Sequence, residues 1–98
     1  MAEVIMTDFK PPYAAEQYDA LDAKIDPIAN RPQGMIFHSA GPSPSGGWRI
    51  LDVWESKEDF DRFFAESVGP AMVELLGEEA LASEEPPEIT SWTLHKHG

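Results

Sequence analysis

The sequence contains no cysteine among its 98 residues. This absence excludes disulfides, thiolate metal sites and thiol redox chemistry. Basic residues are also scarce, because 7 Lys and Arg stand against 18 Asp and Glu and leave a formal charge of −11. Surfaces that bind nucleic acid or anionic lipid need clustered positive charge. We therefore expect no nucleic acid and no membrane surface among the partners of this chain.

Long apolar segments and nucleotide-binding motifs are missing too. No apolar run approaches the roughly 20 residues that span a bilayer, and the first residues lack the basic and apolar regions of a signal peptide. These absences predict a cytoplasmic protein. The sequence has no glycine-rich phosphate loop, no Gly-x-Ser-x-Gly elbow and no dinucleotide fingerprint. It therefore predicts no bound cofactor.

Metal-binding patterns are equally weak. His95 and His97 would share a face of a terminal strand, but two histidines without a third ligand do not form a specific site. The acidic residues near position 80 lack the spacing of a calcium-binding loop. We expect no metal site.

Aromatic and aliphatic residues are plentiful enough for one core. Hydrophobic residues make up 42% of the chain and include three Trp, five Phe and two Tyr. Such a composition is typical of a folded chain rather than a disordered one, and the length suits one domain. We interpret residues 1–98 as a single domain.

The order of elements follows from hydrophobic periodicity and from turn residues. Alternation predicts strands, three- and four-residue spacing predicts helices, and Pro and Gly mark their ends. Ser56 is a natural helix N-cap, Gly69-Pro70 should kink or restart that helix, and Gly77 should end it. The predicted segments are a strand at 4–9, a helix at 13–25, hairpin strands on either side of a loop at 41–47, a helix at 57–76, an acidic linker at 78–87 with a helical turn around 79–82, and a strand at 88–96.

This β-α-β-β-α-β order is the ferredoxin-like pattern, in which two helices cover one face of a four-stranded antiparallel sheet. The hairpin carries large apolar residues on both faces, so the second sheet face would be left uncovered in a monomer. Pairing of two sheets is the simplest way to bury it. We therefore expect a homodimer.

The central hairpin contains most of the residues that could form a functional site. Side chains alternate across a strand, so a hairpin without a bulge places His38 and Asp52 on one face. The same face would carry Ile36, Ala40, Trp48, Ile50 and Trp54, while Met35, Phe37, Leu51 and Val53 line the other.

The chain resembles the dimeric α/β-barrel superfamily, in the branch of small antibiotic-biosynthesis monooxygenases. The resemblance rests on the order of elements, on the hairpin segments Gly34-Met-Ile-Phe-His-Ser-Ala-Gly-Pro and Gly47-Trp-Arg-Ile-Leu-Asp-Val-Trp-Glu-Ser, and on Glu58-Asp-Phe-Asp-Arg-Phe-Phe leading to Gly69-Pro70. It implies a homodimer with one pocket per subunit, between the sheet and its helices. The chain lacks the Asn, His and Trp set of haem-degrading members, and no catalytic set of the quinone-forming members transfers residue by residue.

His38 and Asp52 are the predicted catalytic pair. If the loop sets position 38 opposite 52 or 50, the carboxylate reaches the imidazole, fixes its tautomer and leaves the other nitrogen as an acid or base. The alternative is a buried pair that only orders the core.

Seven further residues are predicted to bind substrate, and most could equally be core residues. They are Tyr18, Ile36, Trp48, Ile50, Trp54, Phe64 and Trp92. Together these residues suggest a cofactor-independent oxygenase or isomerase acting on a small apolar or aromatic molecule. The alternative is a homodimer that binds a small ligand without catalysis or has a purely structural role.

Overall fold

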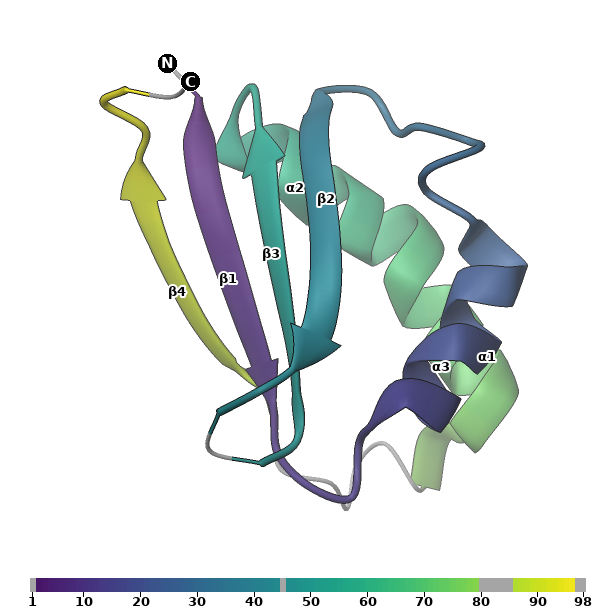
Figure 1. Ribbon diagram of the computed structural model, residues 1–98. Helices are drawn as coiled ribbons and strands as arrows, with labels where there is room; N and C mark the ends of the chain where they lie inside the picture. Colours follow the sequence, from purple (N-terminus) through teal and green to yellow (C-terminus); the bar gives the residue numbers. More distant parts are fainter. Residues whose placement is uncertain (1, 45, 80–85, 97–98) are drawn as a thin grey trace.

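The structure is a computed structural model that describes residues 2–44, 46–79 and 86–96. The elements follow the predicted order (Figure 1). They are β1 (Glu3–Phe9), α1 (Ala15–Ile25), β2 (Met35–Pro42), β3 (Trp48–Trp54), α2 (Lys57–Phe63), the π-helical turn η1 (Phe64–Val68), α3 (Gly69–Leu76) and β4 (Glu88–Thr93). The helical turn predicted around 79–82 falls mostly outside the described residues.

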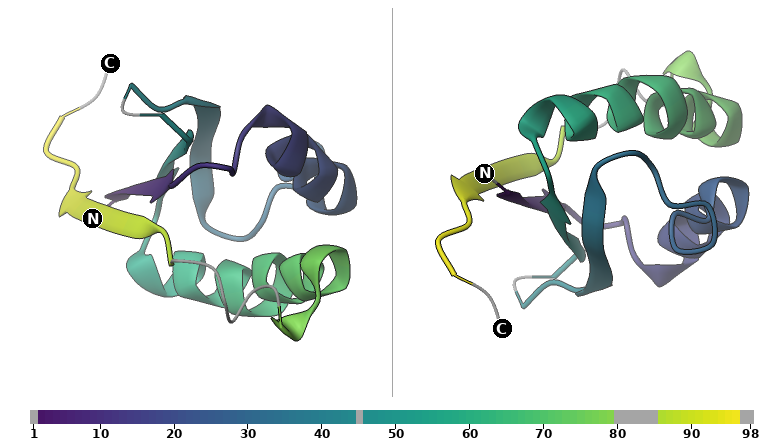
Figure 2. Two further views of the ribbon diagram at one scale, coloured as in Figure 1. Left: turned by 90° about the horizontal axis from the view of Figure 1, so that it is seen from below. Right: turned by 90° about the horizontal axis from the view of Figure 1, so that it is seen from above.

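The four strands form one antiparallel sheet in the order β2-β3-β1-β4. Helix α1 and the continuous α2-η1-α3 segment lie on the same side of it, as the views along the sheet in Figure 2 show. This arrangement is the ferredoxin-like fold, and the predicted fold class is confirmed.

Local sequence signals explain the ends of the second helical segment. The Ser56 hydroxyl accepts a hydrogen bond from the Asp59 N–H at 3.2 Å, which makes Ser56 the predicted N-cap of α2. Pro70 has no N–H to continue an α-helical ladder. The chain widens into η1 just before it, where the Gly69 N–H bonds to the Phe64 carbonyl. Gly77 follows the last residue of α3 with φ of 84°, in agreement with its predicted role.

A β-bulge in β2 changes the predicted pattern of faces. Met35 pairs with Trp54, but Phe37 pairs with Val53, so Ile36 is the extra residue. Arg31 donates hydrogen bonds to the carbonyl oxygens of Met35 (3.4 Å) and Ile36 (3.0 Å) at this point. Met35 therefore turns into the core, whereas Ile36 is exposed. The prediction of an unbulged hairpin was wrong at these two residues.

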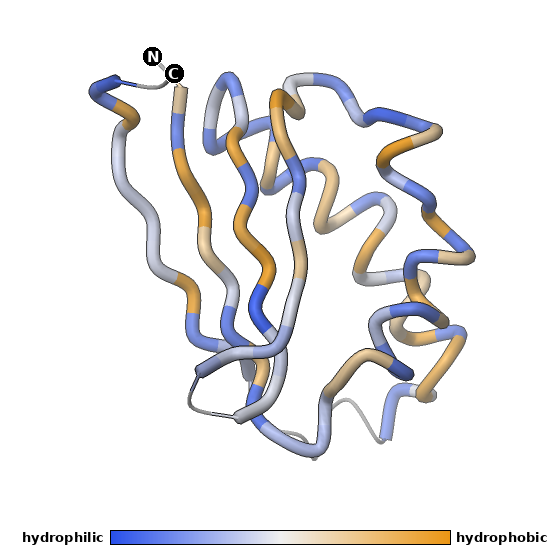
Figure 3. Tube along the Cα trace, viewed as in Figure 1, coloured by the Kyte–Doolittle hydropathy of each residue, from blue (hydrophilic) through white to orange (hydrophobic). Residues whose placement is uncertain are grey.

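The core lies between the sheet and the helices. Ile5, Met35, Trp54 and Phe60 form its centre, and the rings of Trp54 and Phe60 meet nearly edge-on at 5.9 Å between centroids. Figure 3 shows hydrophobic residues along both central strands, β1 and β3.

Among the described residues, no helix covers the opposite sheet face. The strand register places Phe37, Val53, Val4 and Trp92 side by side there. Phe37 is 51% exposed and Trp92 is 44% exposed. Within the described part of the chain, no helix is long and apolar enough to cross a membrane.

Candidate functional site

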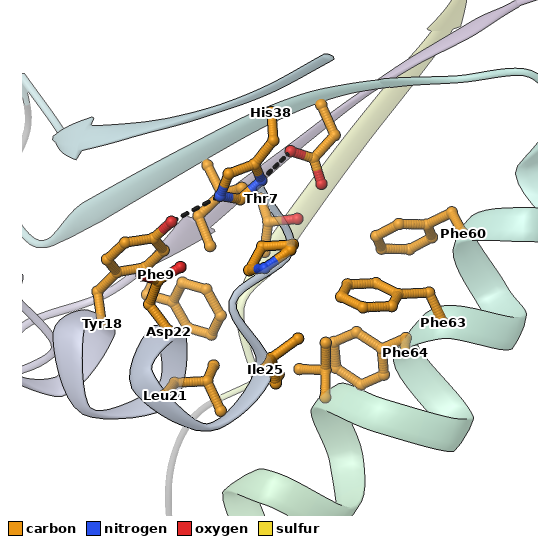
Figure 4. Close-up of a pocket in the computed structure, with 14 residues that line it drawn as sticks. Thr7, Phe9, Tyr18, Leu21, Asp22, Ile25, His38, Phe60, Phe63 and Phe64 are labelled. Atoms are coloured by element: carbon orange, nitrogen blue, oxygen red, sulfur yellow. Dashed lines mark hydrogen bonds and ion pairs between the residues drawn. The ribbon is translucent and has the colours of Figure 1, made fainter. Parts of the chain in front are cut away.

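A pocket opens between the helix-covered face of the sheet, α1 and the α2-η1 segment, and its volume is about 60 Å³. Figure 4 shows Tyr18 and Asp22 projecting from α1 on one side and Phe60, Phe63 and Phe64 on the other. Most of the walls are apolar. The lining residues are Thr7, Phe9, Tyr18, Leu21, Asp22, Ile25, Pro27, His38, Ile50, Asp52, Phe60, Phe63, Phe64 and Val68.

A chain of hydrogen bonds runs from the pocket into the core. The Tyr18 hydroxyl lies 2.6 Å from Nε2 of His38, and Nδ1 of His38 lies 2.7 Å from Oδ1 of Asp52. The second Asp52 oxygen accepts from the Trp54 indole N–H at 3.4 Å. Both ring nitrogens of His38 are therefore held by protein groups.

The strands fix this geometry. His38 and Asp52 are directly opposite residues in the β2-β3 pairing, which is one of the two predicted registers. Their side chains are only 9% and 7% exposed. A carboxylate this close to Nδ1 favours the tautomer that carries its hydrogen there. In that tautomer Nε2 accepts the hydrogen of the Tyr18 hydroxyl.

Tyr18 is held in its neutral form. Partial burial and the nearby carboxylate of Asp22 raise its pKa to about 12, with smaller contributions from Asp52, Tyr13 and Asp19. The ring of Trp48 packs beside Tyr18 with 5.5 Å between the centroids. Tyr18 is thus a positioned phenol that stays protonated throughout the physiological pH range.

The Asp, Glu, Lys and Arg residues that line the pocket are all acidic. Asp22 and Asp52 both line it, and the described lining residues include neither Lys nor Arg. Two carboxylates on the lining of an apolar cavity disfavour an anionic ligand, because unscreened like charges repel strongly in a region of low dielectric. The pocket is better suited to a neutral molecule.

Comparison with known proteins supports the fold alone. No family model matches the chain, and no curated protein matches it. Among solved structures, SnoaB from Streptomyces nogalater, a cofactor-independent oxygenase, aligns with a TM-score of 0.64 and 16% identity over 98% of this chain and 95% of its own. A Chloroflexus aurantiacus protein proposed to be an antibiotic biosynthesis monooxygenase aligns with a TM-score of 0.63 and 19% identity over 100% and 98%.

Rv0793 from Mycobacterium tuberculosis is similar as well, with a TM-score of 0.60 and 16% identity over 98% of this chain and 95% of its own. This chain shares their fold. The resemblance predicted from the sequence is confirmed at that level. Function has to be argued from the pocket, since one fold supports many chemistries.

Within this ferredoxin-like fold, the pocket brings together part of the predicted site. His38, Asp52, Tyr18, Ile50 and Phe64 all line it. Trp54 lies behind the pocket, fully buried in the core, where its indole holds Asp52. Trp48 supports Tyr18 and is not a lining residue.

Ile36 and Trp92 were predicted to bind substrate, and the structure places both outside the pocket. The bulge in β2 turns Ile36 away from the core. Trp92 pairs with Val4, whose neighbour Ile5 points into the core, so Trp92 lies on the uncovered sheet face. Both placements differ from the expected ones because each depended on which face of a strand the residue occupies.

The sequence reading missed several lining residues, of which Asp22 matters most. It follows Tyr18 by four residues and so shares its helix face. Phe60 and Phe63 also form pocket walls. Among the described residues, no group of three or more His, Cys, Asp or Glu side chains could hold a metal ion.

Proposed function

We propose that this protein is a homodimeric enzyme that performs acid–base chemistry on a small, neutral, largely apolar or aromatic molecule. The observation that carries the proposal is the largely buried His38 side chain, bonded on both sides, on the lining of an aromatic pocket. Titratable groups with defined partners in a cleft are the usual components of acid–base catalysis.

Each residue has a role in this proposal. His38 is the acid/base residue, and Asp52 orients it and stabilises the imidazolium that forms when it takes a proton. Ile50 and Phe64 are walls of the apolar cavity that would hold the substrate. The water-poor cavity would also protect a reactive anion from the solvent.

Two reactions follow from such an anion. In an oxygenase, an electron-rich anion reduces O2, one oxygen atom enters the substrate and the other leaves as water with two hydrogens taken from the substrate. In an isomerase, the same proton returns to a different atom. Neither reaction requires a bound cofactor. The likeness to SnoaB, a cofactor-independent oxygenase, supports the first.

The homodimer part of the proposal is supported by the uncovered sheet face. Phe37 and Trp92 expose large apolar areas there, beside the half-buried Leu51 and Val53. Contiguous apolar surface on a sheet commonly marks an interface. Self-association across this face would bury it on both copies.

The test uses a panel of phenols and naphthols incubated with the protein in air, without added cofactor. Oxygen consumption and product masses are recorded for the wild-type protein, for His38→Gln and for His95→Gln, a histidine just past β4. We expect turnover by the wild-type protein and by His95→Gln. His38→Gln should lose at least about 100-fold in rate, which is the usual worth of a general acid or base.

The products separate the candidate functions. A gain of oxygen identifies an oxygenase, and a rearranged product of unchanged mass identifies an isomerase. Quenching of tryptophan fluorescence without any product would leave a binding protein. Equal turnover by the wild-type protein and by a folded His38→Gln variant would refute the role of His38.

A further inference from the structure

His38 has no ring nitrogen available to a ligand. Nδ1 is bonded to Asp52 and Nε2 to Tyr18, at 2.7 and 2.6 Å. A substrate in the pocket could reach the imidazole only by displacing Tyr18 or through the Tyr18 oxygen. Displacement would leave the phenol hydrogen of a partly buried residue without its acceptor, which costs free energy.

The Tyr18 oxygen is the polar atom at the pocket end of the hydrogen-bonded series Asp52, His38 and Tyr18. Its hydrogen is used in the bond to His38, and its lone pairs remain as acceptors for a donor in the pocket, which Tyr18 lines. Figure 4 shows the Tyr18 hydroxyl and His38 linked at the upper edge of the cavity, across from the phenylalanines. A hydroxylated ring lying against those phenylalanines would face this end.

We propose that Tyr18 is a catalytic residue, which accepts the proton of the substrate hydroxyl group and passes its own proton to His38. The substrate itself, a neutral molecule with an acidic hydroxyl group such as a phenol, is taken from the proposed function. This deepens the proposed function and rests on it. In this assignment Tyr18 is more than a wall of the pocket, because its oxygen contacts the proton that the substrate loses.

The transfer is balanced and concerted. The substrate O–H bond breaks as an O–H bond forms on the Tyr18 oxygen, while the original Tyr18 O–H bond breaks and an N–H bond forms at Nε2 of His38. The substrate becomes an anion, His38 becomes an imidazolium, and Tyr18 is neutral before and after. Asp52 stays a carboxylate and pairs with the new positive charge.

The surroundings of Tyr18 favour the concerted path over a tyrosinate base. Asp22 and Asp19 on its own helix, Asp52 on β3 and Tyr13 all oppose a negative charge on its oxygen, and burial adds to them, which raises the pKa to about 12. A phenol that resists ionisation passes its proton to His38 only if it gains one from the substrate at the same time. The same carboxylates disfavour a substrate that is already an anion.

The probe is 4-nitrophenol, whose phenolate absorbs visible light and whose neutral form does not. It is titrated with the wild-type protein, Tyr18→Phe, His38→Gln and the control Tyr13→Phe, at a pH below the pKa of the free probe. We expect the wild-type protein and Tyr13→Phe to raise the phenolate fraction of bound probe. Tyr18→Phe and His38→Gln should lower the bound phenolate-to-phenol ratio at least tenfold.

The outcomes distinguish this inference from the proposed function. If a folded Tyr18→Phe variant forms phenolate as well as the wild-type protein while His38→Gln does not, His38 takes the proton directly and only the role of Tyr18 fails. If His38→Gln also forms it, both proposals fail. Absence of binding, or of phenolate, in the wild-type protein would overturn the inference.

Two further measurements do not depend on the Tyr18→Phe variant. With 3-fluorotyrosine incorporated into the Tyr13→Phe chain, the single fluorine signal reports Tyr18. Adding 4-nitrophenol should shift this signal, and an unchanged signal would contradict contact with the probe. The anionic comparator 4-hydroxybenzoate should bind at least tenfold more weakly than 4-nitrophenol, and equal affinity would contradict the substrate class.

Discussion

Asp52 connects the site to the core at the scale of single residues. One carboxylate oxygen accepts from His38 and the other from Trp54, and the side chain is only 7% exposed. Hydrogen bonds to a buried charged group contribute more to stability than surface pairs do, because their loss leaves polar atoms without water. Asp52 therefore serves both the proposed chemistry and the fold.

Asp52→Asn is expected to lower the free energy of unfolding by about 1.5–3 kcal/mol, as for other hydrogen bonds to charged groups. The matched control is Asp8→Asn, which breaks the more exposed ion pair of Asp8 with Arg49 on the other sheet face. Such surface pairs contribute less than about 1 kcal/mol. Urea denaturation measures both changes, and equal losses would contradict a special role of Asp52 in stability.

Tyr18 leads to a prediction about pH. Its pKa is about 12 in the folded protein against 10.0 for an ordinary tyrosine. Because the folded state binds this proton more tightly, the stability that Tyr18 contributes is complete below pH 10 and is lost as the pH rises through about 12. Absorbance titration of the phenol in a Tyr13→Phe chain should show a midpoint well above the ordinary value, although the small contribution of Tyr13 is removed. A midpoint at the ordinary value would contradict the environment described for Tyr18.

At the scale of elements, the α2-η1-α3 segment brings aromatic residues to the pocket. Its first turn depends on Ser56, whose hydroxyl caps the Asp59 N–H. Phe60 and Phe63 follow within two turns and line the cavity. The cap therefore contributes indirectly to the shape of the pocket wall.

Ser56→Ala should destabilise the protein by about 1 kcal/mol, the usual cost of removing an N-cap. Ser56→Thr keeps an acceptor at the same place and should recover most of the loss. Thermal unfolding followed by circular dichroism compares the two. A Thr variant as unstable as the Ala variant would show that the hydroxyl acts by some means other than capping.

At the scale of the whole molecule, the apolar sheet face supports the proposed homodimer. Phe37→Lys places a charge on that face, at the edge strand β2, and should halve the mass measured by light scattering after gel filtration. Ile28→Lys is the control, because Ile28 is 66% exposed on the connector after α1. It should leave the mass unchanged. A wild-type protein that runs as a monomer would refute the dimer.

The sequence by itself determined the order of elements and much of the local structure. Alternation, helical spacing and the residues Ser56, Gly69, Pro70 and Gly77 act over a few residues, so they can be read without the fold. The closeness of His38 and Asp52 belongs here as well, because the register of a hairpin is a local property.

Only the tertiary structure decided the rest. The bulge at Ile36 depends on Met35 reaching the core and on Arg31 binding two carbonyl oxygens. The face of Trp92 depends on pairing with a strand more than 80 residues away. The contact of Tyr18 with His38 requires α1 to dock on the sheet. Each of these results from packing between segments distant in the chain, which short-range patterns do not encode.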